Sequence, residues 1–137
     1  MDKAYASASS GAPLKVLAGV DWTLNAGEAA SIIGPSGSGK STLLNIIGTL
    51  DHADDGKVEL NGRNLAQLDD LQLADVRSRQ LGFIFQFHYL LPQCTVWENV
   101  LVPTLSTAAG GPSGVDERAK RLLERVGLGA RIGHRPG

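Results

Sequence analysis

The sequence predicts an α/β fold organised around a glycine-rich loop, on three observations. Residues 29–33 form a short apolar segment of strand character that runs directly into the loop. Residues 41–50, after the loop, place Leu and Ile on most of the surface of a helix, which is typical of a helix buried against a sheet. Residues 81–85 (LGFIF) are apolar on both faces, as in an inner strand of a parallel sheet.

The other elements in the first part of the chain are predicted from local patterns. Residues 1–10 are small and polar, and Ser9-Ser10-Gly11 indicates a flexible entry or loop. Residues 20–24 alternate apolar and polar side chains as a half-buried strand does, and residues 25–28 supply a turn. Residues 57–60 alternate again, and the Asn-Gly pair at 61–62 is a strong hairpin signal.

The second part of the chain is predicted to be mainly helical. Residues 69–80 have helical character. Thr95 and Glu98 have the spacing of a capping box, so a helix is expected to begin there and to run toward Pro103.

A last helix is predicted after a connector rich in Gly, Ala and Ser, residues 107–114. Ser113 and Asp116 offer a cap for this helix, and apolar residues then recur at helical spacing as far as Val126. Gly127 stands where a glycine commonly ends a helix.

Composition excludes several classes of protein. The chain has 137 residues and a formal net charge of -1, which excludes the strongly basic surface of a general nucleic-acid binder. Its single cysteine, Cys94, excludes an intrachain disulfide framework and fits a reducing compartment. No apolar run approaches the ~18 residues of a membrane span, and no secretory leader is expected. We therefore expect a soluble, intracellular protein.

The glycine-rich loop is a phosphate-binding motif. Residues 34–41 (GPSGSGKS) match the P-loop pattern G-x-x-x-x-G-K-[ST]. Its glycines let successive backbone N–H groups point at phosphate oxygens, and the N-terminus of the next helix favours the same anion. An accidental glycine-rich turn is the alternative, but residue frequencies give such a match on the order of one time in a hundred.

The motif assigns roles to its side chains. Lys40 is expected to reach the terminal phosphates as a point charge, and the Ser41 hydroxyl is placed to ligate Mg²⁺. The predicted phosphate-binding residues are Gly34, Pro35, Ser36, Gly37, Ser38, Gly39, Lys40, Ser41 and Thr42.

Several segments together resemble the ATP-binding subunit of ABC transporters, most of all its lipoprotein-releasing and macrolide-exporting branch. These segments are GPSGSGKSTLL at 34–44, Leu50-Asp51 with the glycines at 56 and 62, LGFIFQFHYLLP at 81–92 and TVWENV at 95–100. They occur in the order and spacing of the family, and the resemblance extends over nearly the whole chain. It implies ATP and Mg²⁺ as ligands and ATP hydrolysis as the activity.

The resemblance also implies an architecture. It is a P-loop NTPase fold with an antiparallel β subdomain and the start of an α-helical subdomain, as an incomplete domain. Residues 1–90 would form the nucleotide-binding core with the β subdomain, and residues 91–137 the first part of the helical subdomain.

Two further site residues are implied by position. Gln86 resembles the Q-loop glutamine, which in the family touches Mg²⁺ and the attacking water, so Gln86 and Lys40 are the predicted catalytic residues. A polar residue that merely ends a strand is the alternative for Gln86. Tyr5 resembles the aromatic residue that stacks on adenine, and its alternative is a residue of a disordered leader.

The family implies partners and a location. The aromatic residues near Gln86 would by default pack in the core, but the resemblance suggests that residues 87–92 line a groove for a helix of an integral membrane permease. A head-to-tail homodimer of the full-length protein is implied as well. The protein would then lie in the cytoplasm, peripherally on the inner face of the bacterial cytoplasmic membrane.

Three family motifs do not occur in the sequence: the LSGGQ signature, a Walker B strand ending in Asp-Glu, and a switch histidine. His134 is a structural residue that precedes the signature in relatives, not the switch histidine. The chain therefore resembles the front part of a longer ATPase, and we expect it to be inactive in hydrolysis alone. A soluble P-loop kinase or a non-catalytic nucleotide-binding module is the alternative function.

Overall fold

The computed structural model describes residues 1–6, 11–106 and 113–137. The chain divides into two compact units, Met1–Leu73 and Ala74–Gly137.

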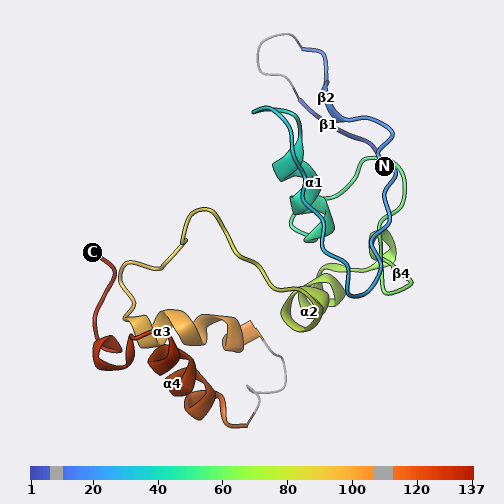
Figure 1. The fold of residues 1–137 in the computed structure, drawn as a ribbon. Coiled ribbons are helices and arrows are strands. Elements are labelled where there is room, and N and C mark those ends of the chain that lie inside the picture. Colours follow the sequence, from blue (N-terminus) through green and yellow to red (C-terminus); the bar gives the residue numbers. More distant parts are fainter. Residues whose placement is uncertain (7–10, 107–112) are drawn as a thin grey trace. The chain divides into compact units, whose positions relative to one another are not determined.

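The first unit begins with a two-stranded antiparallel ribbon (Figure 1). Strand β1 (Lys3–Tyr5) pairs with β2 (Leu14–Leu17), so that Tyr5 lies opposite Leu14 and Lys3 opposite Leu17. The disordered leader, the alternative for Tyr5, is therefore wrong, because β2 holds residues 3–5 in a strand. Ser9 and Ser10 of the predicted flexible entry lie outside the described residues.

Helix α1 (Lys40–Ile47) follows the glycine-rich loop and is three residues shorter than predicted at its C-terminal end. The chain leaves the helix through a Schellman motif, in which the N–H groups of Thr49 and Leu50 donate to the carbonyls of Ile46 at 3.1 Å and Asn45 at 2.8 Å. Thr49 takes the left-handed conformation of this motif, with φ 58. A β-branched residue rarely adopts this conformation, which persists only where the surrounding structure holds it, here through the two hydrogen bonds of the motif.

The predicted hairpin is confirmed. Strands β3 (Glu59–Leu60) and β4 (Arg63–Asn64) pair antiparallel around Asn61 and Gly62, whose φ angles of 51 and 76 are those of a two-residue primed turn. A 3₁₀ turn (Leu65–Gln67) follows, capped by the Asn64 side chain. The buried apolar side chains of this unit include Leu17, Ile46, Leu65 and Leu73.

Helices dominate the rest of the chain, as predicted. They are α2 (Asp70–Gln80), α3 (Val96–Leu101), α4 (Val115–Arg125) and two 3₁₀ helices, Val102–Ser106 and Gly129–Arg131. The capping box is confirmed, because the Thr95 side chain accepts from the Glu98 N–H while the Glu98 carboxylate accepts from the Thr95 N–H.

The cap of α4 differs from the prediction. Gly114, in the left-handed conformation with φ 80, is the N-cap residue, and no side-chain hydrogen bond caps this end. Ser113 and Asp116 were expected there, but Ser113 lies one residue before the cap position and Asp116 lies within the first turn of the helix. Gly127 has φ 74 after α4, as predicted for a helix-ending glycine. The rest of the predicted connector, residues 107–112, lies outside the described residues.

In the second unit α3 and α4 lie side by side, and the C-terminal segment joins them (Figure 1). Ala119 and Leu123 of α4 are buried. The N–H groups of Val96 and Trp97, in the first turn of α3, donate to the carbonyls of His134 at 2.8 Å and Ile132 at 3.0 Å. These bonds satisfy donors that a helix leaves without partners inside itself.

Three predicted strands do not form. Residues 20–24, 29–33 and 81–85 carry no strand pairing in the described part of the chain. Ile33 and Ile84 are 88% and 103% exposed. An inner strand of a sheet is held by neighbouring strands on both of its edges, and the strands of the described residues pair only as β1 with β2 and β3 with β4.

Candidate functional site

The glycine-rich loop curls back on itself before α1. Gly37 and Gly39 have φ angles of 79 and 88, a region that favours glycine. Gly39 also has no room for a side chain, because a Cβ there would stand 2.9 Å from Leu17 Cδ2 and 3.0 Å from the Val16 carbonyl oxygen. The loop is thus pressed against strand β2 at this residue.

The loop and the first turn of α1 enclose a hollow of about 230 Å³. No side chain in the described part of the chain caps the N-terminus of α1, so the N–H groups of its first turn remain available for an anion. The hollow is lined by Val16, Ser36, Gly37, Gly39, Lys40, Ser41 and Thr42. All of these except Val16 are among the predicted phosphate-binding residues.

Lys40 places a positive charge within the loop. Its Nζ donates to the carbonyl oxygens of Gly34 at 3.0 Å and Pro35 at 2.7 Å, and lies 3.5 Å from Ser38 Oγ. The ammonium is therefore held by the backbone of the loop, and no carboxylate pairs with it in the part of the chain that the structure describes. Its charge is left to a ligand, and a phosphate is the anion that this combination of ammonium and backbone N–H groups suits.

Ser41 is the predicted Mg²⁺ ligand in the glycine-rich loop. Ser41 is exposed and lines the hollow, so its hydroxyl is accessible to an ion beside bound phosphates. Among the described residues, no group of three or more His, Cys, Asp and Glu side chains could hold a metal ion. An exposed serine hydroxyl beside the phosphate hollow fits Mg²⁺ that takes most of its ligands from phosphate and water, which is how Mg²⁺ is commonly held.

Tyr5 lies at the end of β1, on the same ribbon that supports the loop. Its hydroxyl donates to Asp51 Oδ2 at 2.5 Å, and Lys3 Nζ stands 5.1 Å from its ring centroid. The side chain is 39% exposed. Tyr5 is therefore not part of a leader, and its role as an adenine-stacking residue stays a prediction.

Sequence reasoning missed Asp51, the acceptor for Tyr5. The Tyr5 hydroxyl and then the Lys3 ammonium lower the pKa of Asp51 to about 2. In turn, the hydrogen bond to Asp51 raises the pKa of Lys3. The spacing of two positions between Lys3 and Tyr5 predicts that their side chains lie on one face of a strand. Their shared acidic partner could not be predicted from this spacing, because it is 46 residues after Tyr5.

Gln86 belongs to the second unit, in an exposed bend without regular structure. Its catalytic and metal roles stay predictions. Near it, Phe85 stacks with Phe83 at 5.5 Å between ring centroids and meets Tyr89 edge-on at 5.3 Å. Residues 82–92 are exposed, so these aromatic side chains form no buried core in this unit, contrary to the default expectation for such a cluster.

The loop, the hollow and the helix N-terminus define a P-loop nucleotide-binding protein. The chain matches the family model described as ABC transporter over residues 17–136, and it therefore belongs to that family. The predicted family and fold class are confirmed. Among the described residues, none of the helices is both long and apolar enough to span a membrane.

Within the family, the chain is similar to proteins of lipoprotein-releasing systems. It is 50% identical over 123 residues to the lipoprotein-releasing system ATP-binding protein LolD of Alcanivorax borkumensis, which is 90% of this chain and 54% of that protein. It is 50% identical over 137 residues to LolD 1 of Rhodopirellula baltica, 99% of this chain and 58% of that protein.

The backbone resembles solved ATP-binding cassettes. A dimeric structure of the cassette MJ0796 in a post-hydrolysis state, bound to ADP and Pi, matches with a TM-score of 0.82 and 38% identity. The match covers 98% of this chain and 59% of that one. The chain thus spans less than two thirds of the length of the relatives described.

Proposed function

We propose that the protein is the ATP-binding subunit of an ABC transporter that powers lipoprotein release or a related export process. The observation that supports this most directly is the hollow at the N-terminus of α1, where Lys40 and uncapped N–H groups meet. The similarity to LolD proteins supports the lipoprotein-releasing branch.

The ligand is Mg-ATP, and each part of the site takes one part of it. Residues 34–42 bind the phosphates, with Lys40 on the terminal ones. Ser41 and Gln86 hold Mg²⁺, which supplies positive charge to the phosphate oxygens when bound. Tyr5 stacks on the adenine ring, and base stacking on an aromatic side chain is worth ~1–3 kcal/mol per base.

Hydrolysis needs more than this site contains. Transfer of a phosphoryl group to water requires a positioned nucleophile and charge stabilisation from several directions. The sequence holds no Asp-Glu after a run of aliphatic residues and no LSGGQ. Losing one such electrostatic group typically costs ~10²–10³ in rate. The 137-residue chain therefore binds Mg-ATP weakly and does not hydrolyse it at a meaningful rate.

The partners follow from the same proposal. An integral membrane permease receives the segment 87–92, whose side chains are exposed. Two copies of the full-length protein form a head-to-tail dimer around ATP, on the cytoplasmic side of the bacterial inner membrane. Residues 1–90 act as the nucleotide-binding core with its β subdomain, and residues 91–137 begin the helical subdomain.

Substitution of Lys40 tests the site. In Lys40→Ala the charge-assisted contact to phosphate is lost, and ATP binding should weaken at least tenfold, about 1.4 kcal/mol. Titration with a fluorescent ATP analogue measures this, and Lys120→Ala, an exposed lysine of α4, is the matched control. Equal affinities of Lys40→Ala and the unchanged protein would reject the nucleotide site.

A further inference from the structure

Lys3 of β1 and the turn after α1, residues 51–55, form a connected polar network. Lys3 Nζ donates to Asp51 Oδ1 at 2.9 Å and to the His52 carbonyl at 2.7 Å, and lies 3.4 Å from Asp54 Oδ1. The Lys3 side chain is only 10% exposed. A nearly buried ammonium with three oxygen partners is fixed in place, because removing any partner would leave its charge less compensated.

The same turn holds the backbone of β1. The Ala4 N–H donates to Asp54 Oδ2 at 2.7 Å, and Asp2 and Asp55 form a β-bridge. Strand β1 is therefore bound on one edge by β2 and on the other by residues 51–55. The only side-chain polar atom of Tyr5, its hydroxyl, is held by Asp51 at 2.5 Å.

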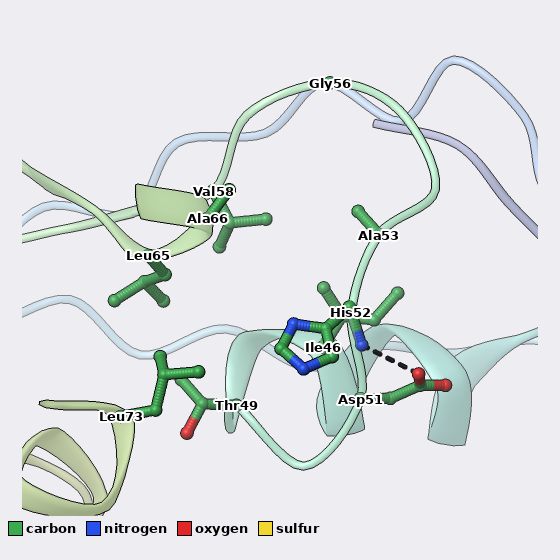
Figure 2. Close-up of a pocket in the computed structure, with 10 residues that line it drawn as sticks. All are labelled: Ile46, Thr49, Asp51, His52, Ala53, Gly56, Val58, Leu65, Ala66 and Leu73. Carbon is green, nitrogen blue, oxygen red and sulfur yellow. Dashed lines mark hydrogen bonds between the residues drawn. The ribbon is translucent and has the colours of Figure 1, made fainter. Parts of the chain in front are cut away.

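Asp51 is itself placed by the end of α1. The Schellman motif sets the direction of the chain at Thr49 and Leu50, and the Asp51 N–H donates to the Asn45 carbonyl at 3.3 Å. Figure 2 shows Asp51 beside α1, with its carboxylate accepting from the His52 N–H at 2.7 Å. Asp51 thus accepts hydrogen bonds on both of its oxygens, from the backbone, from Lys3 and from Tyr5.

The ribbon of β1 and β2 connects this polar network to the phosphate hollow. Val16 of β2 lines the hollow, and Tyr5 of β1 lies opposite Leu14, two residues from Val16. Two strand residues correspond to about 7 Å along the ribbon. Helix α1 connects the two ends, because Gly39 at its start contacts β2 and Asp51 follows its other end.

We propose that Asp51 and Lys3 are positioning residues that hold the Tyr5 ring as a preformed platform for the base of an adenine nucleotide. This inference rests on the proposed function, in which Tyr5 stacks on adenine. Asp51 fixes the hydroxyl end of the ring and Lys3 stands over one face, while the ring keeps 39% of its surface exposed. A side chain that is already immobile loses little rotamer freedom when a base stacks on it, so binding is tighter.

Two tyrosine variants separate the platform from its anchor. Tyr5→Ala removes the ring, and ATP affinity should fall about tenfold while the affinity for inorganic triphosphate stays the same. Tyr5→Phe keeps the ring and all contacts of Lys3 but loses the bond to Asp51. Its ATP affinity should fall about fivefold, again with no change for triphosphate. Isothermal titration calorimetry with ATP and with inorganic triphosphate measures both affinities and gives their ratio for each variant.

The carboxylate is tested in the same way. Asp51→Ala should lose at least as much ATP affinity as Tyr5→Phe, because it removes the bond to Tyr5 and also one partner of Lys3. The double variant should lose no more than Asp51→Ala alone, because the bond to Tyr5 is already absent there. Asp55→Ala, an exposed aspartate of the same turn, is the control with the same change of charge and should bind like the unchanged protein. A purely structural role for Asp51 would weaken ATP and triphosphate equally, and that result would overturn the inference.

The results for the two tyrosine variants distinguish the positioning role of Asp51 and Lys3 from base stacking on Tyr5 itself. If Tyr5→Phe binds ATP as tightly as the unchanged protein while Tyr5→Ala does not, the ring stacks without needing its anchor, and only the positioning role is rejected. If Tyr5→Ala leaves the ratio of the two affinities unchanged, base stacking on Tyr5 is rejected, and the positioning role with it.

Discussion

The loop before α1 and the apolar segment after α2 depend on contacts of different range. In residues 34–42, the bonds of Lys40 to Gly34, Pro35 and Ser38 join residues at most six positions apart. Residues 81–91 carry more apolar surface, yet their ring contacts are aromatic pairs among themselves, and Ile84 is fully exposed.

The difference shows which kind of sequence signal is sufficient by itself. Glycine conformation and a helix N-terminus build the loop from neighbouring residues, so the loop needs only α1 and β2 around it. An apolar strand needs neighbouring strands on both edges, and no pattern within it can provide them. The loop should therefore be sensitive to changes in its local support, whereas the apolar segment should be insensitive to changes in its side chains.

The largest effect is expected at Ile46, a buried residue of α1, the helix that follows the loop; its side chain is 3% exposed. Ile46→Ala should lower the free energy of unfolding by about 3 kcal/mol, because it removes three buried carbon atoms and leaves a cavity. Urea denaturation followed by circular dichroism measures this. A loss below about 1 kcal/mol would mean that the support of α1 is loosely packed, and the contrast with residues 81–91 would disappear.

A second effect is expected at Asn99, which joins the end of the apolar segment to α3. Its amide donates to the carbonyls of Leu91, Cys94 and Thr95 at 2.9–3.1 Å, and its Oδ1 accepts from the Leu91 N–H at 2.8 Å. Asn99→Ala should cost about 2 kcal/mol of unfolding free energy, because partly buried backbone groups lose their partners.

The control for Asn99 is another helical asparagine. Asn45 is exposed on α1, so Asn45→Ala should be neutral or slightly stabilising through helix propensity. Urea denaturation measures the unfolding free energy of both variants. Hydrogen exchange of the Leu91 amide is a second measurement, and we expect faster exchange in Asn99→Ala alone. Similar results for the two variants would show that the anchor at residue 91 does not depend on this amide.

The contrast between local and distant contacts also explains what the sequence could predict. The P-loop, the Asn-Gly hairpin and the Thr95–Glu98 capping box each depend on residues within a few positions, and each was found as predicted. Strand β1 and the acceptor of Tyr5 were missed because Asp51 is distant in the sequence. The N-cap at Gly114 was missed because a polar side chain nearby was the more usual cap.

A smaller effect is expected from pH, through a contact of long range in the first unit. The pKa of Asp51, lowered to about 2 from an ordinary 3.8 by Tyr5 and then Lys3, favours the carboxylate in the folded state. Its stabilisation is therefore complete above pH 4 and is lost as the pH falls through 2. Since the side chain is 27% exposed, we expect about 1 kcal/mol.

Denaturation between pH 5 and 2 measures this contribution. The unchanged protein should lose about 1 kcal/mol more than Asp51→Asn over that range, because the amide cannot titrate. Tyr5→Phe removes the first of the two donors and should give an intermediate loss. Identical pH profiles for the unchanged protein and Asp51→Asn would mean that Asp51 is not held by this network in solution.

The smallest effect is expected at Ile84, in the apolar segment after α2. Ile84→Ala makes the same change as Ile46→Ala but removes atoms that contact solvent, since Ile84 is 103% exposed. The unfolding free energy should change by less than about 0.5 kcal/mol, as it does for surface substitutions that break no contact. Urea denaturation of the two isoleucine variants side by side, at several protein concentrations, is the measurement.

A loss at Ile84 comparable to that at Ile46 would show that this side chain is buried in solution. If that loss grew with protein concentration, a second copy would be covering the segment; if it did not, the segment would be packed within its own chain. Either result would end the contrast between the two regions, because the apolar segment would then have found the distant partners that its sequence requires.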